Sequence, residues 1–238
     1  LFASGEIRGG LALTEPNAGT DLQAIRTIAR REGDEYVING SKTFISSGLN
    51  CDLVVVVAKT NPEAGAKGVS LILVEADRPG FRKGRKLEKI GQDAADTAEL
   101  FFDDVRVPVT NRLGEENRGF AYLMQELAQE RFVIALRSAA CMEAMFESTV
   151  RYVKERKVFG QSLFDFQNSK FKLAEIKSKM VAMRIMVDYY LAEHMKRKLT
   201  VEEAAIAKLY CTETLWEGLD AMLQLHGGYG YMMEYPIA

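Results

Sequence analysis

Cysteine is scarce in this chain of 238 residues, and its placement excludes two kinds of stabilised fold. The three cysteines, Cys51, Cys141 and Cys211, are odd in number, lie far apart and never form a Cys-x-x-Cys pair. We therefore expect neither a disulfide framework nor a metal site, and we expect a reducing compartment.

Long apolar runs and an excess of one charge are missing as well. No apolar run reaches the roughly 20 residues that cross a bilayer, so no membrane span is expected. The formal net charge of -2 gives no global field that would favour nucleic acid or an anionic membrane. No Gly-x-Gly-x-x-Gly follows a first strand and no P-loop occurs, which disfavours a Rossmann unit. No targeting peptide is visible, although the chain does not begin with methionine.

Short β-type runs separated by turn residues fill the first half of the chain. The runs at 53–58, 69–74 and 97–102 are apolar and short enough for buried strands. Two further runs flank Asn39-Gly40, a dipeptide typical of a two-residue hairpin, so we predict a hairpin there. Together these signals predict a small antiparallel β-barrel or sandwich over residues 1–112.

Beyond about residue 117 the apolar residues recur at helical spacing. We predict one helix over residues 119–156, a second from Asp165, and a third from a capping box at Thr200 to Gly227-Gly228. The expected core positions include Phe120, Leu123, Leu127, Ile134, Leu136, Ala140, Met145, Val153, Phe171, Ala174, Met180, Met183, Val187, Leu191, Ile206, Leu209, Leu215, Leu219 and Leu223. The fold class is α+β, with the β domain (1–112) followed by an antiparallel helical bundle (113–238).

Two segments carry polar groups where chemistry could take place. The loop at residues 11–21 contains Pro16 and Gly19, and such a loop leaves backbone N–H groups and hydroxyls for an anion or a ring edge. As an isolated pattern the same loop is merely a turn. Glu130 and Arg131 stand side by side in an apolar helix. On the solvated side they are surface charges, whereas burial in a pocket would make Glu130 a usable general base.

Several motifs, in order along the chain, resemble those of one flavoenzyme family. The segments Leu13-Thr14-Glu15-Pro16-Asn17-Ala18-Gly19-Thr20-Asp21 and Asn39-Gly40-Ser41-Lys42-Thr43-Phe44-Ile45-Ser46 resemble the flavin-binding signature of the acyl-CoA dehydrogenases. Arg156-Lys157-Val158-Phe159-Gly160, Phe166-Gln167 and the glycine-rich stretch at 224–231 resemble its later motifs. The resemblance covers nearly the whole chain and is strongest to the long-chain branch, through residues 84–87, 96–102 and 129–131. Members also carry a helical domain before the β domain and a last helical segment, so we expect this chain to be a fragment.

The resemblance implies FAD as cofactor and oxidation of a long-chain acyl-CoA thioester to the trans-2-enoyl-CoA. A carboxylate would remove the α-proton while the β-hydrogen leaves as hydride to the flavin. In the long-chain and isovaleryl branches this base matches Glu130. Thr20 and Arg131 would contact the acyl-CoA. The implied FAD contacts are Leu13, Thr14, Thr20, Phe44, Ser46, Arg156, Phe166, Gln167, Gln224, Gly227 and Gly228.

The resemblance also implies partners. Electrons would pass to an electron-transfer flavoprotein, and the protein would form a homo-oligomer, a tetramer, in which Arg156 and the 224–228 turn serve the neighbour's flavin. The compartment would be the mitochondrial matrix in a eukaryote or the cytoplasm in a bacterium. Two alternatives remain: an acyl-CoA oxidase that uses oxygen on the same fold, and a non-catalytic acyl-CoA-binding or assembly fragment.

Overall fold

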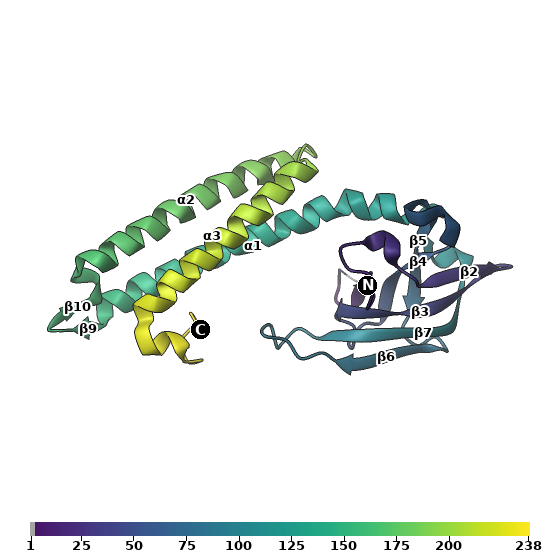
Figure 1. The fold of residues 1–238 in the computed structure, drawn as a ribbon, viewed down its shortest axis with the longest axis horizontal. Helices are drawn as coiled ribbons and strands as arrows, with labels where there is room; N and C mark the ends of the chain where they lie inside the picture. The colour runs from purple at the N-terminus through teal and green to yellow at the C-terminus, as the bar shows by residue number, and fades with distance from the viewer. Residues whose placement is uncertain (1–2) are drawn as a thin grey trace. The chain divides into compact units, whose positions relative to one another are not determined.

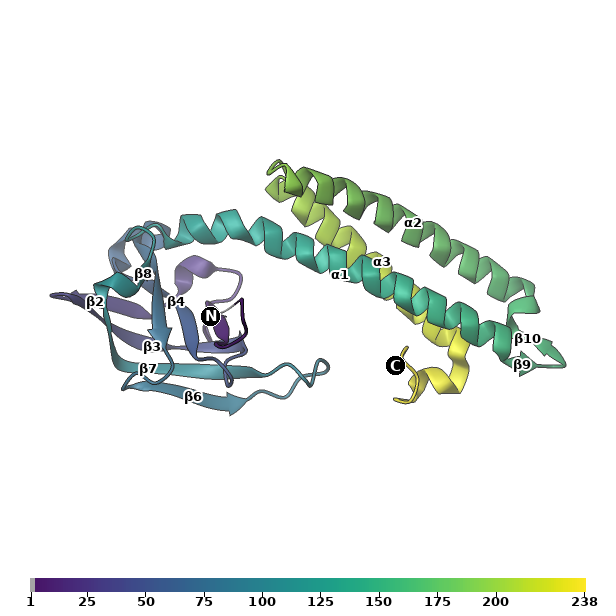
Figure 2. The same cartoon turned by 180° about the vertical axis from the view of Figure 1, so that it is seen from behind.

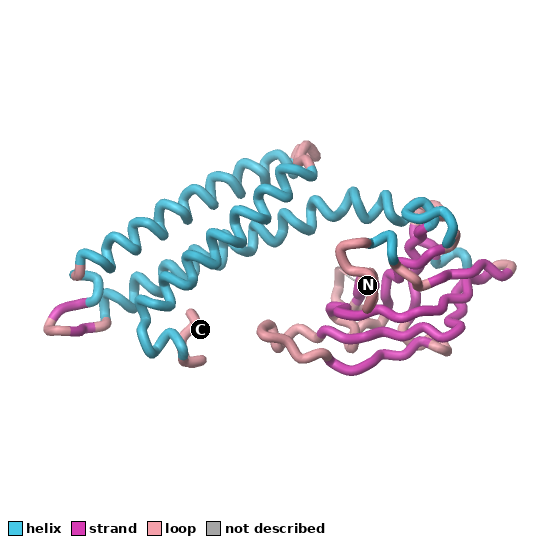
Figure 3. Tube along the Cα trace, viewed as in Figure 1, coloured by secondary structure: helices cyan, strands magenta, loops and turns pink. Residues whose placement is uncertain are grey.

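The computed structural model describes residues 3–238 and divides into two compact units. The first unit, Leu1–Met124, holds a β-sheet, and the second, Gln125–Ala238, holds long helices (Figures 1 and 2). Strands occur in the first unit and in one short hairpin between two helices of the second (Figure 3). The boundary expected between residues 112 and 113 stays a prediction.

One eight-stranded sheet forms the first unit, in the order β6-β7-β3-β2-β4-β5-β8 with β1 beside β4. Most neighbours are antiparallel, but β4 pairs in parallel with β1 and, at one residue pair, with β2. The strands predicted at 53–58, 69–74 and 97–102 are confirmed as β4, β5 and the start of β7, in a sheet that is mixed but mostly antiparallel. The strands are β1 (Gly9–Ala12), β2 (Ile28–Glu32), β3 (Glu35–Ser46), β4 (Leu53–Lys59), β5 (Val69–Glu75), β6 (Phe81–Lys86), β7 (Thr97–Pro108) and β8 (Arg112–Leu113).

The unbroken apolar run of β4 follows from the position of this strand between two cores. Successive side chains of a strand point to opposite faces of the sheet. Val54 and Val56 lie on one face and join the main core of the sheet. Val57 lies on the other face and packs in a second cluster with Leu123 from the start of α1 (Gly119–Glu155). Because both faces are covered, neither set of side chains is polar.

The hairpin predicted at Asn39-Gly40 is wrong. β3 runs through this dipeptide, and the turn between β2 and β3 lies at Gly33, which has a φ of 62°. Gly40 instead sits at a bulge opposite β7, where an added Cβ would lie 2.5 Å from Thr27 Oγ1. The Asn39 side chain donates to the Asp104 carboxylate and accepts from its backbone N–H. The dipeptide therefore supports a bulge and a cross-strand contact.

Three long helices make up most of the second unit, the first of them beginning at Gly119 in the first unit. The predicted ends of the first and third helices are confirmed to within a residue, whereas the second begins at Gln167, two residues after the predicted Asp165. The helices are α1, α2 (Gln167–Met195) and α3 (Val201–His226), and the hairpin of β9 (Lys157–Val158) and β10 (Gln161–Ser162) joins the first two. A capping box starts α3: the Thr200 hydroxyl accepts from Glu203 N at 3.1 Å, and the Glu203 carboxylate accepts from Thr200 N at 2.9 Å. Gly227, with a φ of 58°, ends it.

The buried faces of these helices differ in part from the prediction, because small residues let the helices approach closely. A Cβ added to Gly218 of α3 would lie 2.3 Å from Met142 Cε of α1. Met180, Met183 and Val187 are buried as predicted. The fully buried side chains of α3 in this core are Ala204, Ala207, Cys211 and Met222, and the predicted Leu215 and Leu219 pack against it half-buried. Eight predicted core residues are exposed: Ile134, Ala140, Phe171, Ala174, Leu191, Ile206, Leu209 and Leu223.

Candidate functional site

The loop after β1 is anchored by a buried ion pair that sequence reasoning missed. Lys42 Nζ of β3 lies 2.8 Å from Glu15 Oε1 and also donates to the carbonyls of Leu13, at 3.0 Å, and Val57, at 2.7 Å. The side chain of Lys42 is fully buried and that of Glu15 is 6% exposed. A lysine at an inward-facing position of an apolar strand was the signal available in the sequence.

Electrostatics keeps this carboxyl group ionised. Burial acts to raise the pKa of Glu15, but hydrogen bonds from Lys42 and Thr27 and the charge of Lys42 outweigh it, so the pKa lies below its ordinary value. Burial lowers the pKa of Lys42, and Glu15 opposes that shift. Backbone N–H groups of Arg26 and Thr27 also donate to the Glu15 carboxylate, at 2.6 and 3.0 Å.

The predicted ring contacts of the first unit lie along this anchored loop and the end of β3. Thr14 is bound to β3 because its carbonyl accepts from Thr43 N at 2.9 Å. Phe44 lies at a bulge with a φ of 58° and is 67% exposed, and Ser46 ends the strand. Leu13 and Thr14 are half-buried, whereas Thr20 is exposed in the loop beyond. The first unit therefore presents hydroxyls and an aromatic ring on a fixed backbone.

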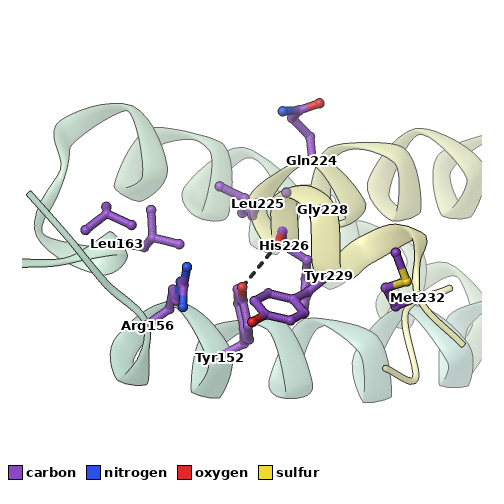
Figure 4. A pocket seen from close by; sticks show the side chains of 11 residues that line it. Tyr152, Arg156, Leu163, Gln224, Leu225, His226, Gly228, Tyr229 and Met232 are labelled. Carbon is purple, nitrogen blue, oxygen red and sulfur yellow. Dashed lines mark hydrogen bonds between the residues drawn. The ribbon is translucent and has the colours of Figure 1, made fainter. Parts of the chain in front are cut away.

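A cavity of about 540 Å³ lies in the second unit, where the β9–β10 hairpin meets the end of α3 (Figure 4). The cavity is lined by four of the predicted FAD residues: Arg156, Gln224, Gly227 and Gly228. Phe166 and Gln167 are not part of this lining. Phe166 instead occupies the residue position just before α2, and its ring centroid lies 6.5 Å from that of Phe159. The lining consists of Tyr152, Arg156, Val158, Leu163, Gln224, Leu225, His226, Gly227, Gly228, Tyr229 and Met232.

Buried aromatic contacts hold the glycine turn at this cavity. His226 is 4% exposed, and its Nδ1 lies 2.9 Å from the carbonyl of Met222. The Tyr152 ring stacks on the His226 ring at 4.2 Å, and its hydroxyl donates to the His226 carbonyl at 3.2 Å (Figure 4). Burial raises the pKa of the Tyr152 hydroxyl, which favours its protonated, donating form. His226 is thus a structural residue whose contacts fix the turn.

The glycine turn has open space beside its backbone, which a phosphate-bearing cofactor requires. A Cβ added to Gly227 or Gly228 would meet no heavy atom of the described residues within 4 Å. The Arg156 guanidinium lies 5.4 Å above the Tyr229 ring, and among residues 3–238 it forms no ion pair with a carboxylate. Free space beside the glycine backbone and an arginine without a carboxylate partner both suit a pyrophosphate. The residues present therefore fit FAD.

Glu130 and Arg131 lie on α1 in the second unit. Glu130 is exposed and Arg131 is half-buried. Within the described part of the chain, neither forms a salt bridge, with the other or with a third residue. A second cavity, of about 850 Å³, opens at the start of this helix without Glu130 in its lining. It is lined by Gln125, Glu126, Ala128, Gln129, His194, Met195, Arg197 and Leu199.

No group of three or more His, Cys, Asp or Glu side chains in the range 3–238 is arranged to hold a metal ion. No helix within the same range is both long and apolar enough to cross a membrane.

Comparison with known proteins gives the family. The model of the acyl-CoA dehydrogenase middle domain matches residues 10–105, and that of the acyl-CoA dehydrogenase C-terminal domain matches residues 117–238. The mouse protein named long-chain specific acyl-CoA dehydrogenase, mitochondrial, is 51% identical over 239 aligned residues, covering 100% of this chain and 56% of its own length. The chain thus spans little more than half of that relative.

Two further relatives agree with this match. An acyl-CoA dehydrogenase structure from Geobacillus kaustophilus superposes with a TM-score of 0.95 at 48% identity, covering 98% of this chain and 62% of that one. The CarC subunit of the caffeyl-CoA reductase–Etf complex of Acetobacterium woodii is 37% identical over 98% of this chain and 62% of its own length. With both domain models matched in order, the chain belongs to the acyl-CoA dehydrogenase family, whose members are FAD-dependent flavoproteins.

Proposed function

We propose that the protein containing this chain is an FAD-dependent acyl-CoA dehydrogenase that converts long-chain acyl-CoA thioesters to trans-2-enoyl-CoA. The observation that carries the proposal is that both family domains occur in one chain, each with its ligand segment in a form that suits a ligand. The loop at Leu13–Thr14 is anchored with its side chains available, and the Gly227–Gly228 turn is open beside Arg156. The 51% identity to a long-chain enzyme supports the substrate class.

The two units would carry different FAD contacts. Leu13, Thr14, Phe44 and Ser46 of the first unit would contact the flavin ring, and Thr20 would contact FAD and the acyl-CoA thioester. Arg156 and the backbone of the glycine turn would hold the pyrophosphate, because a guanidinium and close backbone donors suit its charge. The other ribityl and adenine contacts would come from Phe166, Gln167, Gln224, Gly227 and Gly228. Bound FAD would supply the two-electron oxidising capacity that no side chain has.

Glu130 would take the α-proton of the thioester. An exposed carboxylate without a cationic partner is available for that role once a ligand and the remaining structure cover it. Arg131, which does not neutralise Glu130, would bind the CoA moiety, where a fixed cation matches phosphate.

We further propose an electron-transfer flavoprotein as acceptor, a homotetramer as the assembly, and the mitochondrial matrix or bacterial cytoplasm as the location. A relative that is itself a subunit of an Etf-containing complex supports the acceptor. The mouse relative, whose name places it in mitochondria, supports the first location.

The test uses the purified full-length protein. It should be yellow with flavin absorption, and palmitoyl-CoA should bleach that absorption without oxygen. Reoxidation by an electron-transfer flavoprotein is the expected next step. Rapid formation of hydrogen peroxide in air would make the protein an oxidase instead. A colourless protein that binds acyl-CoA, with no flavin uptake on reconstitution, would contradict the proposal and favour a non-catalytic binding module.

A further inference from the structure

We propose that the buried Lys42–Glu15 pair is a positioning device for the loop carrying Leu13 and Thr14, and that its effect falls on cofactor binding more than on folding. The inference rests on the proposed function, because it concerns the same site. Neither residue would touch the cofactor; both would act through the backbone of Leu13 and Thr14.

The contacts of one ammonium group tie the loop to two strands. Lys42 projects from β3, and its three N–H donors are matched by three acceptors: the Leu13 carbonyl, the Glu15 carboxylate and the Val57 carbonyl of β4. The other oxygen of Glu15 accepts from Arg26 N, so the pair also reaches the segment before β2. The loop is thus held on both sides by groups that are buried and fully used.

The anchoring leaves the ligand-facing groups free. The carbonyl of Leu13 accepts a hydrogen bond from Lys42 Nζ, and that of Thr14 accepts one from Thr43 N. The Thr14 hydroxyl, in contrast, has no hydrogen-bond partner among residues 3–238. A loop whose backbone is already ordered loses less conformational entropy when a ligand binds, so the pair should raise affinity by pre-organisation.

The ion pair is a poor choice if stability were its only purpose. Removing two charges from water costs about as much as their attraction returns, and well-packed apolar side chains in the same space often do as well or better. A buried pair that joins β3 to the loop presenting the predicted flavin contacts is better explained by placement of that loop. This reasoning also gives the discriminating variant, one in which both charges are removed together.

The experiment compares Lys42→Met with Lys42→Met/Glu15→Gln in the full-length protein. Apoprotein is titrated with FAD, followed by its absorption and fluorescence, and the melting temperature of each apoprotein is recorded. Lys42→Met should lower the melting temperature, because it leaves a buried carboxylate without its cation. The double variant removes that charge and should regain much of the melting temperature. Its FAD dissociation constant should nevertheless stay raised by about tenfold or more, since the loop remains untethered.

Val107→Ala is the matched control. Val107 is buried in β7 opposite Tyr36, at the other end of β3 from Lys42. The Val107→Ala variant should therefore lower the melting temperature while changing the FAD affinity by less than about threefold. Recovery of both properties in the double variant, or equal loss of affinity in Val107→Ala, would overturn the proposal. If a Lys42 variant does not fold, Glu15→Gln alone carries the comparison. Wild-type protein that takes up no FAD would contradict the proposed function itself, a distinguishable result.

Discussion

Glu130 combines an exposed carboxylate with a neighbouring arginine that does not pair with it within the described chain. Glu130→Gln keeps the shape of the side chain but cannot accept the α-proton, so it tests whether Glu130 is the base. We expect this variant to bind FAD and acyl-CoA while flavin reduction slows by about 10²–10⁴-fold, the usual scale of general-base catalysis. Glu130→Asp should slow the step less, because its carboxylate remains but is withdrawn by about one methylene.

Anaerobic stopped-flow bleaching by palmitoyl-CoA measures this step. Glu126→Gln is the control, since Glu126 is an exposed carboxylate one turn earlier on α1, and it should leave the rate near wild type. Near-normal bleaching by Glu130→Gln would remove Glu130 from the mechanism. A loss of FAD together with activity would show that Glu130 has a structural role.

Glu75 gives a pH prediction from its hydrogen bonds. The Arg78 guanidinium and the Asn111 amide donate to this carboxylate and hold its pKa at about 2, below the ordinary value of 4.5. A pKa depressed by folding adds stability above the unfolded value, and that stability is lost as the pH falls from 4.5 toward 2. The side chain is 39% exposed, so the effect should be modest and weakened by salt.

The measurement is melting temperature against pH for wild type and Glu75→Gln. The advantage of wild type should be full at about pH 6 and should shrink through the acid range as Glu75 protonates. Glu63→Gln, in the same unit and without an ion pair among residues 3–238, should show no such pH-dependent difference. A constant difference down to about pH 2 would mean that Glu75 acts through packing and not through its charge.

At the scale of elements, the start of α3 depends on one hydroxyl. Thr200→Ala removes the acceptor for Glu203 N and breaks the capping box, so unfolding should become easier by roughly 0.5–2 kcal/mol. Thr212→Ala on the same helix is the control, because the Thr212 hydroxyl bonds only to carbonyls within its own helix, and its loss should cost little. Urea unfolding of both variants measures this difference. Equal destabilisation would show that the Thr200 capping box does not stabilise the start of α3.

The ends of elements were predictable from sequence, whereas their faces and partners were less so. Thr200 and Gly227 act locally, through the backbone of their own helix, and both predictions are confirmed. The hairpin at Asn39 failed because its outcome depends on Asp104, which lies far away in the sequence. Periodicity assigned Ile206, Leu209 and Leu223 of α3 to the core, but they are exposed, and close helix packing at Gly218 requires a small residue there.

The candidate site shows the same division between local and distant information. Sequence motifs pointed to Thr14 and to the glycine turn, where the structure has an anchored loop and an open cavity. They did not reveal that Lys42 is buried against Glu15, because that pairing needs the register of β1, β3 and β4. The roles of the site residues, Glu130 included, stay predictions.

For the whole molecule, the outer faces of α2 and α3 carry large apolar side chains at helical spacing. On α2, Ile185 is 65% exposed and belongs to a stripe with Val181 and Tyr189. On α3, Leu209 is 65% and Trp216 73% exposed. Side chains of this size on long, regular helices favour contact with other copies of the chain, which supports the proposed homo-oligomer.

Ile185→Arg/Leu209→Arg should therefore shift the full-length protein from the proposed tetramer toward smaller species in sedimentation velocity, because buried charges oppose the contact. If Arg156 and the glycine turn serve the neighbour's flavin, FAD occupancy should fall together with assembly. The control is Ile90→Arg, at a fully exposed position in the loop between β6 and β7 of the first unit, which adds charge without touching the helices. A monomer that keeps full FAD occupancy would show that one chain completes the cofactor site alone.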